Sequence, residues 1–196
     1  MNDLVIPATP AAAAALEVAA AYQSPALQSH SRRVYVWATA LAERENIQYD
    51  AELLFVAAMF HDLSLVPVFD SHTVSFEEAA GHLARVFATG AGWSPVRRER
   101  LGEVIVRHMW PDVSVSDDPA GHLISRAAAL DIVGKNVDEL STEFRADVLK
   151  QFPRLGLTDE FLKCFQAQAE RKPDSSPARA IKADLSTRIA ANPLDA

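Results

Sequence analysis

The sequence predicts an all-α protein of one domain. Apolar residues recur at spacings of three and four along most of the 196 residues, and the alternation typical of β-strands is nearly absent. Only seven glycines interrupt this pattern, and 49% of the residues are hydrophobic, which suffices for a chain of this length to bury a substantial core. We therefore expect a helical bundle around one core.

The first half of the chain predicts three helices, of which the third is buried. Residues 11–22 are expected to form an ordinary surface or core helix, and residues 27–45 have the helical period. Asp50 is suited to cap a third helix over residues 51–61, whose sequence AELLFVAAMFH is apolar on every side after Glu52. A helix without a polar face belongs inside the domain, so we expect the bundle to surround residues 51–61.

The later helices are indicated mainly by their first residues. Ser75 followed by Glu78 has the spacing of a capping box, and Ser94-Pro95 combines an N-cap with a proline at the first helical position. Loops are expected around Pro67 and at 110–119. The further helices that we expect are 75–88, 95–108, 120–135, 142–151, 158–171 and 178–191.

The chain is expected to be a single domain over residues 1–196. Residues 1–24 should contribute an N-terminal helix. Residues 173–196, which follow a Pro/Ser-rich break, should form a helical tail that packs on the domain or on a partner. Oligomeric state is not encoded in any pattern, and a homodimer through the Ala-rich first helix or this tail is one option.

The net charge argues against some classes of binding partner, and the cysteine count excludes an intrachain disulfide. A formal net charge of -7 argues against a nucleic-acid or anionic-membrane surface. No stretch approaches the ~20 apolar residues that a spanning helix needs. Cys164 is the only cysteine, so no intrachain disulfide can form. We expect a cytoplasmic protein that binds neither nucleic acid nor membrane.

The strongest chemical feature is the pair His61-Asp62 at the end of the apolar third helix. Burial of two ionisable groups is costly unless they have partners. Imidazole with carboxylate is a ligand combination that suits zinc, manganese or iron. A structural interpretation, in which Asp62 caps a neighbouring helix and His61 is a satisfied core histidine, competes with this one.

Two more residues favour the metal interpretation. His30 lies on the apolar side of its helix, and Val34 and Trp37 follow on the same side. Because neighbouring helices of a hairpin run antiparallel, His30 and His61 fall at the same end of the pair. Asp131 is embedded in the apolar run AAALDIVG, where a carboxylate needs a cation or several donors. Four ligands from three helices could therefore converge.

At these residues the chain resembles the HD superfamily of metal-dependent enzymes, whose order is His, then His-Asp, then a distant Asp. The closer resemblance is to its cyanamide-hydratase-like branch. It is carried by VIPATP, SHSRRV, AELLFVAAMFHDL, SFEEAAGHLARVF, EVIVRH, ALDIVG, FPRLGL and the tail pieces KPDSS and NPLDA, which are spread over nearly the whole chain.

The resemblance implies an HD-type helical bundle that holds one divalent metal through His30, His61, Asp62 and Asp131. It further implies a hydrolase or hydro-lyase that uses a metal-bound water on a small molecule, with Asp62 and His108 as catalytic residues. Zinc, iron, manganese and nickel all suit two His and two Asp. Residues expected around the pocket or in contact with the ligands are Arg33, Phe76, Glu77 and Trp110.

Three alternative functions remain open. His82 and His108 could hold a second metal, which would make the protein a diiron oxygenase with two irons. A nucleotide phosphohydrolase would need phosphate-binding cations, for which only Arg33, Arg107 and Arg126 are suited. The chain could also be a non-catalytic HD binding module, because Ser64 and Ala127 replace glycines that are usual in the family.

Overall fold

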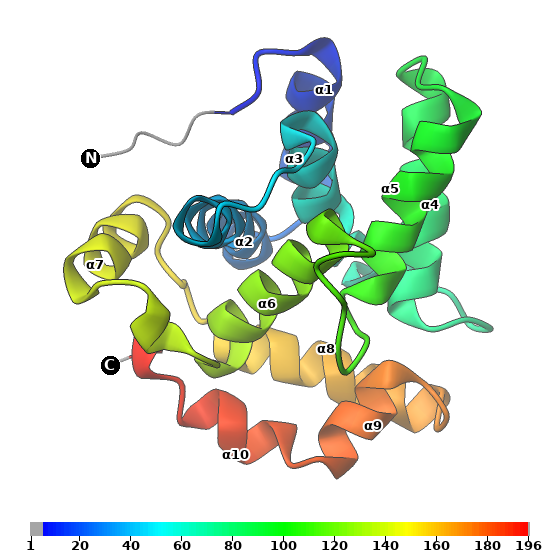
Figure 1. The fold of residues 1–196 in the computed structure, drawn as a ribbon. Coiled ribbons are helices and arrows are strands. Elements are labelled where there is room, and N and C mark those ends of the chain that lie inside the picture. The colour runs from blue at the N-terminus through cyan, green and yellow to red at the C-terminus, as the bar shows by residue number, and fades with distance from the viewer. Residues whose placement is uncertain (1–5, 196) are drawn as a thin grey trace.

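The structure, a computed structural model, describes residues 6–195, and all regular secondary structure in this part of the chain is helical (Figure 1). The expected all-α fold is confirmed. Short 3₁₀ turns connect some of the helices, and no strand occurs within the described range. The α-helices are α1 (Pro10–Tyr22), α2 (Pro25–Glu45), α3 (Ala51–Phe60), α4 (Phe76–Gly90), α5 (Pro95–Arg107), α6 (Pro119–Val133), α7 (Thr142–Gln151), α8 (Leu157–Arg171), α9 (Ser176–Lys182) and α10 (Leu185–Ala190).

Helix α3 is the buried centre of the bundle, as its sequence predicts. Every residue from Leu53 to Phe60 is buried. The helix packs against α1, α2, α4, α5 and α6, so no face is left for polar side chains. The expected cap is present, since the Asp50 carboxylate accepts the Leu53 backbone N–H at 3.0 Å. His61 follows as the C-cap, and this position brings the His61-Asp62 pair to one end of α3.

Helix α2 begins two residues earlier than its periodicity predicts. Ser24 caps it by accepting the Leu27 N–H at 3.1 Å, and Pro25 occupies the first position, where a missing N–H costs nothing. Asn46 ends the helix in the left-handed conformation, with φ of 55°. Trp37 is fully buried on the face that carries His30.

Two local expectations were wrong. Ser75 precedes α4, but its hydroxyl donates to the Glu77 carboxylate at 2.5 Å, so the expected capping box with Glu78 does not form. The single helix expected at 178–191 is divided into α9 and α10. Asp184 lies between them with φ of 60°, a left-handed conformation that no α-helix contains.

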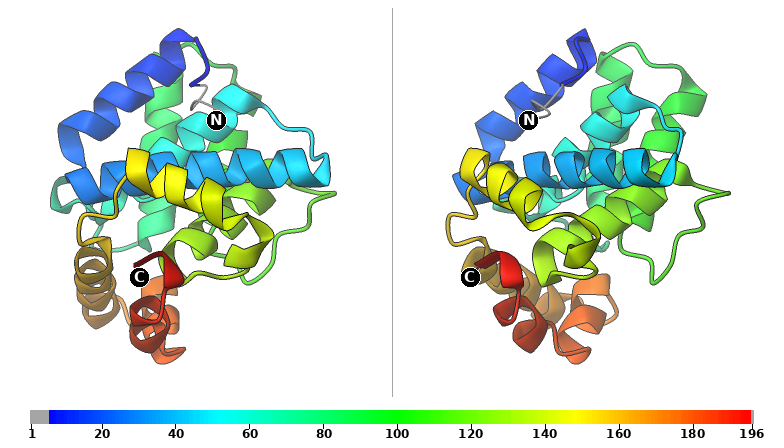
Figure 2. Two further views of the ribbon diagram at one scale, coloured as in Figure 1. Left: turned by 90° about the vertical axis from the view of Figure 1, so that its left-hand side faces the viewer. Right: turned by 60° about the vertical axis from the view of Figure 1, so that its left-hand side comes forward.

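The C-terminal helices build a second, smaller core. Helices α9 and α10 pack on α8, and α10 also contacts the end of α6. Figures 1 and 2 show them on the opposite side of the molecule from α1, with α2 and α6 between. The tail therefore packs on its own domain. The expectation for residues 1–24 extends over residues 1–5, which lie outside the described range.

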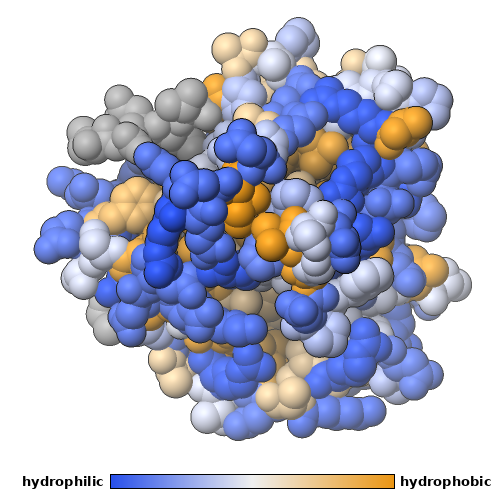
Figure 3. Space-filling model, viewed as in Figure 1, coloured by the Kyte–Doolittle hydropathy of each residue, from blue (hydrophilic) through white to orange (hydrophobic). Residues whose placement is uncertain are grey.

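The surface in the view of Figure 3 is mostly hydrophilic, and hydrophobic residues are visible near its centre. Scattered apolar side chains of this kind are ordinary in a folded domain. Across residues 6–195, none of the helices combines the length and the apolar character that crossing a bilayer requires.

Candidate metal centre

His30, His61 and Asp62 meet at one end of the α2–α3 pair. His30 lies in the second turn of α2, His61 caps the end of α3, and Asp62 follows directly. All three side chains are buried, with at most 1% of each residue exposed. Because the two helices run antiparallel, the start of α2 and the end of α3 lie at the same end of the pair, as the sequence predicts.

Three candidate ligand atoms form a nearly regular triangle. The Nε2 atoms of His30 and His61 are 3.1 Å apart. The Asp62 Oδ2 atom lies 3.2 Å from the first and 3.3 Å from the second. Ligands at about 2.0–2.2 Å from one shared ion have separations of this size. Within residues 6–195, this is the His/Cys/Asp/Glu group whose atoms are close enough to hold a metal ion.

The hydrogen bonds of the His30 and His61 rings leave their two Nε2 atoms as acceptors that face one another. His61 Nδ1 is 2.8 Å from the Ala58 carbonyl oxygen, which only accepts, so Nδ1 carries the hydrogen and Nε2 a lone pair. His30 Nδ1 is 2.7 Å from Asp131 Oδ2 and donates in the same way. Asp62 Oδ2 is buried and has no hydrogen-bond partner in the described part of the chain. Two lone pairs and a carboxylate oxygen therefore converge, and a divalent cation fits them.

In the ion-free protein, the pKa values of His30 and Asp62 also show that positive charge is favoured at this point. Burial lowers the pKa of His30, but its contacts with the Asp131 and Asp62 carboxylates and the charges of both outweigh it, so its pKa lies above the ordinary value. Burial raises the pKa of Asp62, but the neighbouring His61 and His30 hold it well below its usual range. Asp62 is thus ionised, as a ligand must be.

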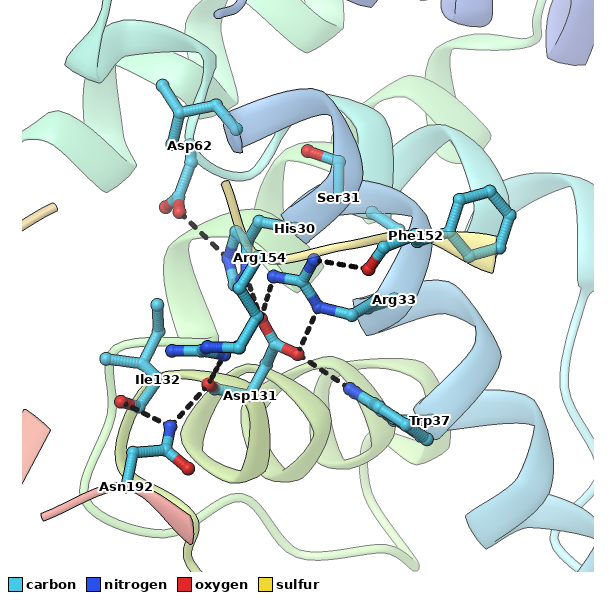
Figure 4. Close-up of polar contacts among 12 residues, drawn as sticks. His30, Ser31, Arg33, Trp37, Asp62, Asp131, Ile132, Phe152, Arg154 and Asn192 are labelled. Atoms are coloured by element: carbon cyan, nitrogen blue, oxygen red, sulfur yellow. Dashed lines mark hydrogen bonds and ion pairs between the residues drawn. The ribbon is translucent and has the colours of Figure 1, made fainter. Parts of the chain in front are cut away.

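The structure places Asp131 outside this triangle. Its carboxylate contacts Nδ1 of His30, whereas the candidate ligand atom of that ring is Nε2. Arg33 and Trp37 also donate to it, and Figure 4 shows all three side chains pointing at the carboxylate. Four ligands from three helices thus do not converge in this arrangement, because the donors of α2 hold Asp131 behind His30.

His108 lies next to the triangle, on its open side. It caps the end of α5, and Nδ1 donates to the Ile105 carbonyl oxygen. Its Nε2 is therefore an acceptor, 3.8 Å from Asp62 Oδ1. Burial and the neighbouring His61 lower the pKa of His108 to about 4, which leaves the ring neutral at pH 7. His108 and Asp62 can both receive a proton at this point.

The remaining residues predicted for the site differ in how close they lie to the triangle. Phe76 is fully buried with its ring 5.6 Å from that of His108. Glu77 is buried and accepts hydroxyl groups of Ser75 and Ser176, so its carboxylate is occupied. Trp110 is 51% exposed and lines the cavity described below. His82 is exposed on α4, and the structure does not bring it to the triangle.

A cavity of about 410 Å³ opens from the triangle toward the surface. Sequence reasoning missed its aromatic wall, Phe161 and Phe165 of α8, whose rings stack at 4.3 Å. Their spacing of four residues on one helix face was the available signal. The Phe161 ring lies 6.1 Å from that of His30. Residues that line the inner cavity include His30, His61, Asp62, His108, Met109, Ile132, Phe161 and Phe165.

One comparison with known proteins matches this region. Residues 27–113 match the HD domain family. The match includes the three triangle residues and His108 and ends before Asp131, and it supports placing the chain in the HD superfamily. An HD domain indicates a metal-dependent function of the hydrolase type, with which the His-His-Asp group is compatible. No curated protein matches the sequence significantly, so the cyanamide-hydratase-like branch stays a prediction.

Proposed function

We propose that this HD-domain protein is a metal-dependent hydrolase or hydro-lyase that acts on a small molecule, with a divalent ion at His30, His61 and Asp62. The observation that carries the proposal is the convergence of two imidazole lone pairs and an unpartnered, buried carboxylate oxygen. Buried acceptors at 3.1–3.3 Å repel one another unless a proton or cation lies between them.

A bound divalent ion would supply a Lewis acid and would lower the pKa of a coordinated water. Asp62 and His108 would take part in proton transfer. Asp62 Oδ1 and His108 Nε2 lie 3.8 Å apart and both accept, so a donor between them can give a proton to either. The ring of Phe76 packs against His108 and that of Phe161 against His30, so both histidines have apolar neighbours.

The pairing of three arginines near the site favours a substrate without phosphate. The arginines considered above for phosphate each have a carboxylate partner: Arg33 is paired with Asp131, Arg107 with Asp118 and Arg126 with Glu45 and Glu139. Lys135 and Arg188 also line the cavity, but both are exposed at its outer part. Paired guanidinium groups offer little to an anion. A small molecule without phosphate, such as the nitrile that the cyanamide-hydratase-like resemblance suggests, suits apolar walls and acceptor atoms better.

Metal counting tests the site. We expect purified protein to contain one divalent ion per chain by elemental analysis, and His61→Ala to lose it. His82→Ala is the matched control, because it removes an exposed histidine of α4 and should retain the ion. Full occupancy in His61→Ala would overturn the site, and two irons per chain with loss in His82→Ala would favour the diiron alternative.

Turnover tests the substrate class. Metal-loaded protein should be incubated with cyanamide and other small nitriles in one arm and with nucleoside monophosphates in the other. We expect product only in the first arm, and its loss in His108→Ala with the ion retained. Release of phosphate from the nucleotides would support the phosphohydrolase alternative. No turnover of any compound by metal-loaded protein would favour a binding module.

A further inference from the structure

The Asp131 carboxylate has no lone pair left for a metal ion. Oδ1 accepts Arg33 Nε and Trp37 Nε1, and Oδ2 accepts Arg33 Nη2 and His30 Nδ1, all at 2.7–2.8 Å. An ionised carboxylate has about four acceptor positions, and all are used here. Arg33 and Asp131 are fully buried, so no water is at hand to replace a donor that is withdrawn.

The backbone of Asp131 is restrained as well, by residues from outside α6. Arg154 and Asn192 each donate to its carbonyl oxygen at 2.8 Å, and Asn192 also donates to that of Ile132 at 2.9 Å (Figure 4). These bonds satisfy carbonyls that the end of a helix leaves free. Asp131 is thus fixed at both its side chain and its main chain, and rotation toward the triangle would break several bonds.

We propose that Asp131 is a positioning residue and not a metal ligand. It accepts Nδ1–H of His30, which fixes the ring orientation and presents the Nε2 lone pair to the ion at His61 and Asp62. A carboxylate behind a ligating histidine orients the ring and increases its basicity. This inference rests on the proposed metal site, and it replaces the four-residue ligand set with a set of three protein ligands.

The direct test is Asp131→Asn, with zinc as the probe. We expect zinc to bind with affinity lowered ~10–100-fold, because the amide oxygen is a weaker partner for His30. X-ray absorption should show the same number of protein ligands as in the wild type. Asp118→Asn is the matched control: Asp118 is also buried, lies at the other end of α6 and pairs with Arg100 and Arg107. We expect its zinc affinity to be unchanged.

A second measurement uses the wild-type protein and therefore does not depend on whether a variant folds. With zinc bound to the wild-type protein, ¹⁵N NMR of the histidine rings should show Nδ1 of His30 protonated and hydrogen-bonded. A missing proton on this nitrogen overturns the inference. So does an Asp131→Asn protein that loses one oxygen ligand, or one that binds zinc as tightly as the wild type. Failure of the wild type to bind zinc overturns the proposed site and this inference together, whereas loss of an oxygen ligand in Asp131→Asn overturns the inference alone.

Discussion

Arg33 and Asp131 form a bidentate ion pair that solvent does not reach. Nε and Nη2 of Arg33 donate to Oδ1 and Oδ2 of Asp131, both at 2.8 Å, and neither side chain has any exposed surface. Arg33 Nη1 also donates to the carbonyl oxygens of Phe152 and Pro153. The pair thus connects α2, α6 and the segment after α7, immediately behind the candidate ligand His30.

Replacement of Arg33 should be severely destabilising. Arg33→Met leaves the Asp131 carboxylate buried without its cation, and breaking a buried pair in this way costs about 3–5 kcal/mol. The free energy of unfolding should be measured in urea with a chelator present, so that loss of an ion does not contribute. Arg44→Met is the control, because the pair of Arg44 with Glu139 is partly exposed and should contribute at most about 1 kcal/mol. Equal costs in both variants would contradict the importance of the buried pair.

The raised pKa of His30 predicts how stability depends on pH in the ion-free protein. A group whose pKa is higher in the folded than in the unfolded chain stabilises the fold fully below the unfolded value of 6.5, and this contribution disappears as pH rises through the folded value. The free energy of unfolding should therefore fall as pH rises above about 6.5. Urea titrations from pH 6 to 9 with a chelator would measure it. His30→Gln should flatten the dependence and His82→Gln should not, and an unchanged slope in His30→Gln would contradict the assignment.

Gly134 should tolerate no side chain. It ends α6 with φ of 66°, and a Cβ atom there would lie 2.5 Å from Cδ of Pro193 in the C-terminal segment. We expect Gly134→Ala to lower the free energy of unfolding by more than about 1 kcal/mol. Gly90→Ala is the counterpart at the end of α4, where nothing lies within 4 Å, and it should be neutral or stabilising by up to about 1 kcal/mol. Thermal denaturation of both variants checks the contrast.

Cys164 should be unreactive in the folded protein. Burial raises its pKa to about 11, and the carboxylates of Glu160, Asp62 and Asp70 act in the same direction. Because the thiolate is the nucleophile, alkylation by iodoacetamide at pH 8 should be much slower in the folded chain than in urea. Mass spectrometry at timed intervals measures both rates. Equal rates would mean that the thiol is activated in the fold.

The helices were predictable wherever one short-range interaction decides a boundary. Asp50 caps α3 and Ser94 caps α5 as expected, because a cap bonds a backbone N–H only three residues away. The cap predicted at Ser75 was wrong: the Ser75 hydroxyl faces Glu77 and Ser176, the latter 101 residues away in the chain, and does not accept a backbone N–H of α4. A local pattern fails where other side chains, some of them distant in sequence, orient the capping group elsewhere.

In the candidate site, too, local features were predictable and contacts between distant residues were not. The sequence alone determined that His61-Asp62 ends a buried helix and that His30 lies on an apolar helix face at the same end, since helical period and hairpin direction are local properties. Only the tertiary structure decided how Asp131 is used. Its need for a cation was visible in the run AAALDIVG, but two kinds of cation could meet it, a metal ion or a guanidinium group. Arg33 lies 98 residues away in sequence and is brought to Asp131 by the packing of α2 on α6.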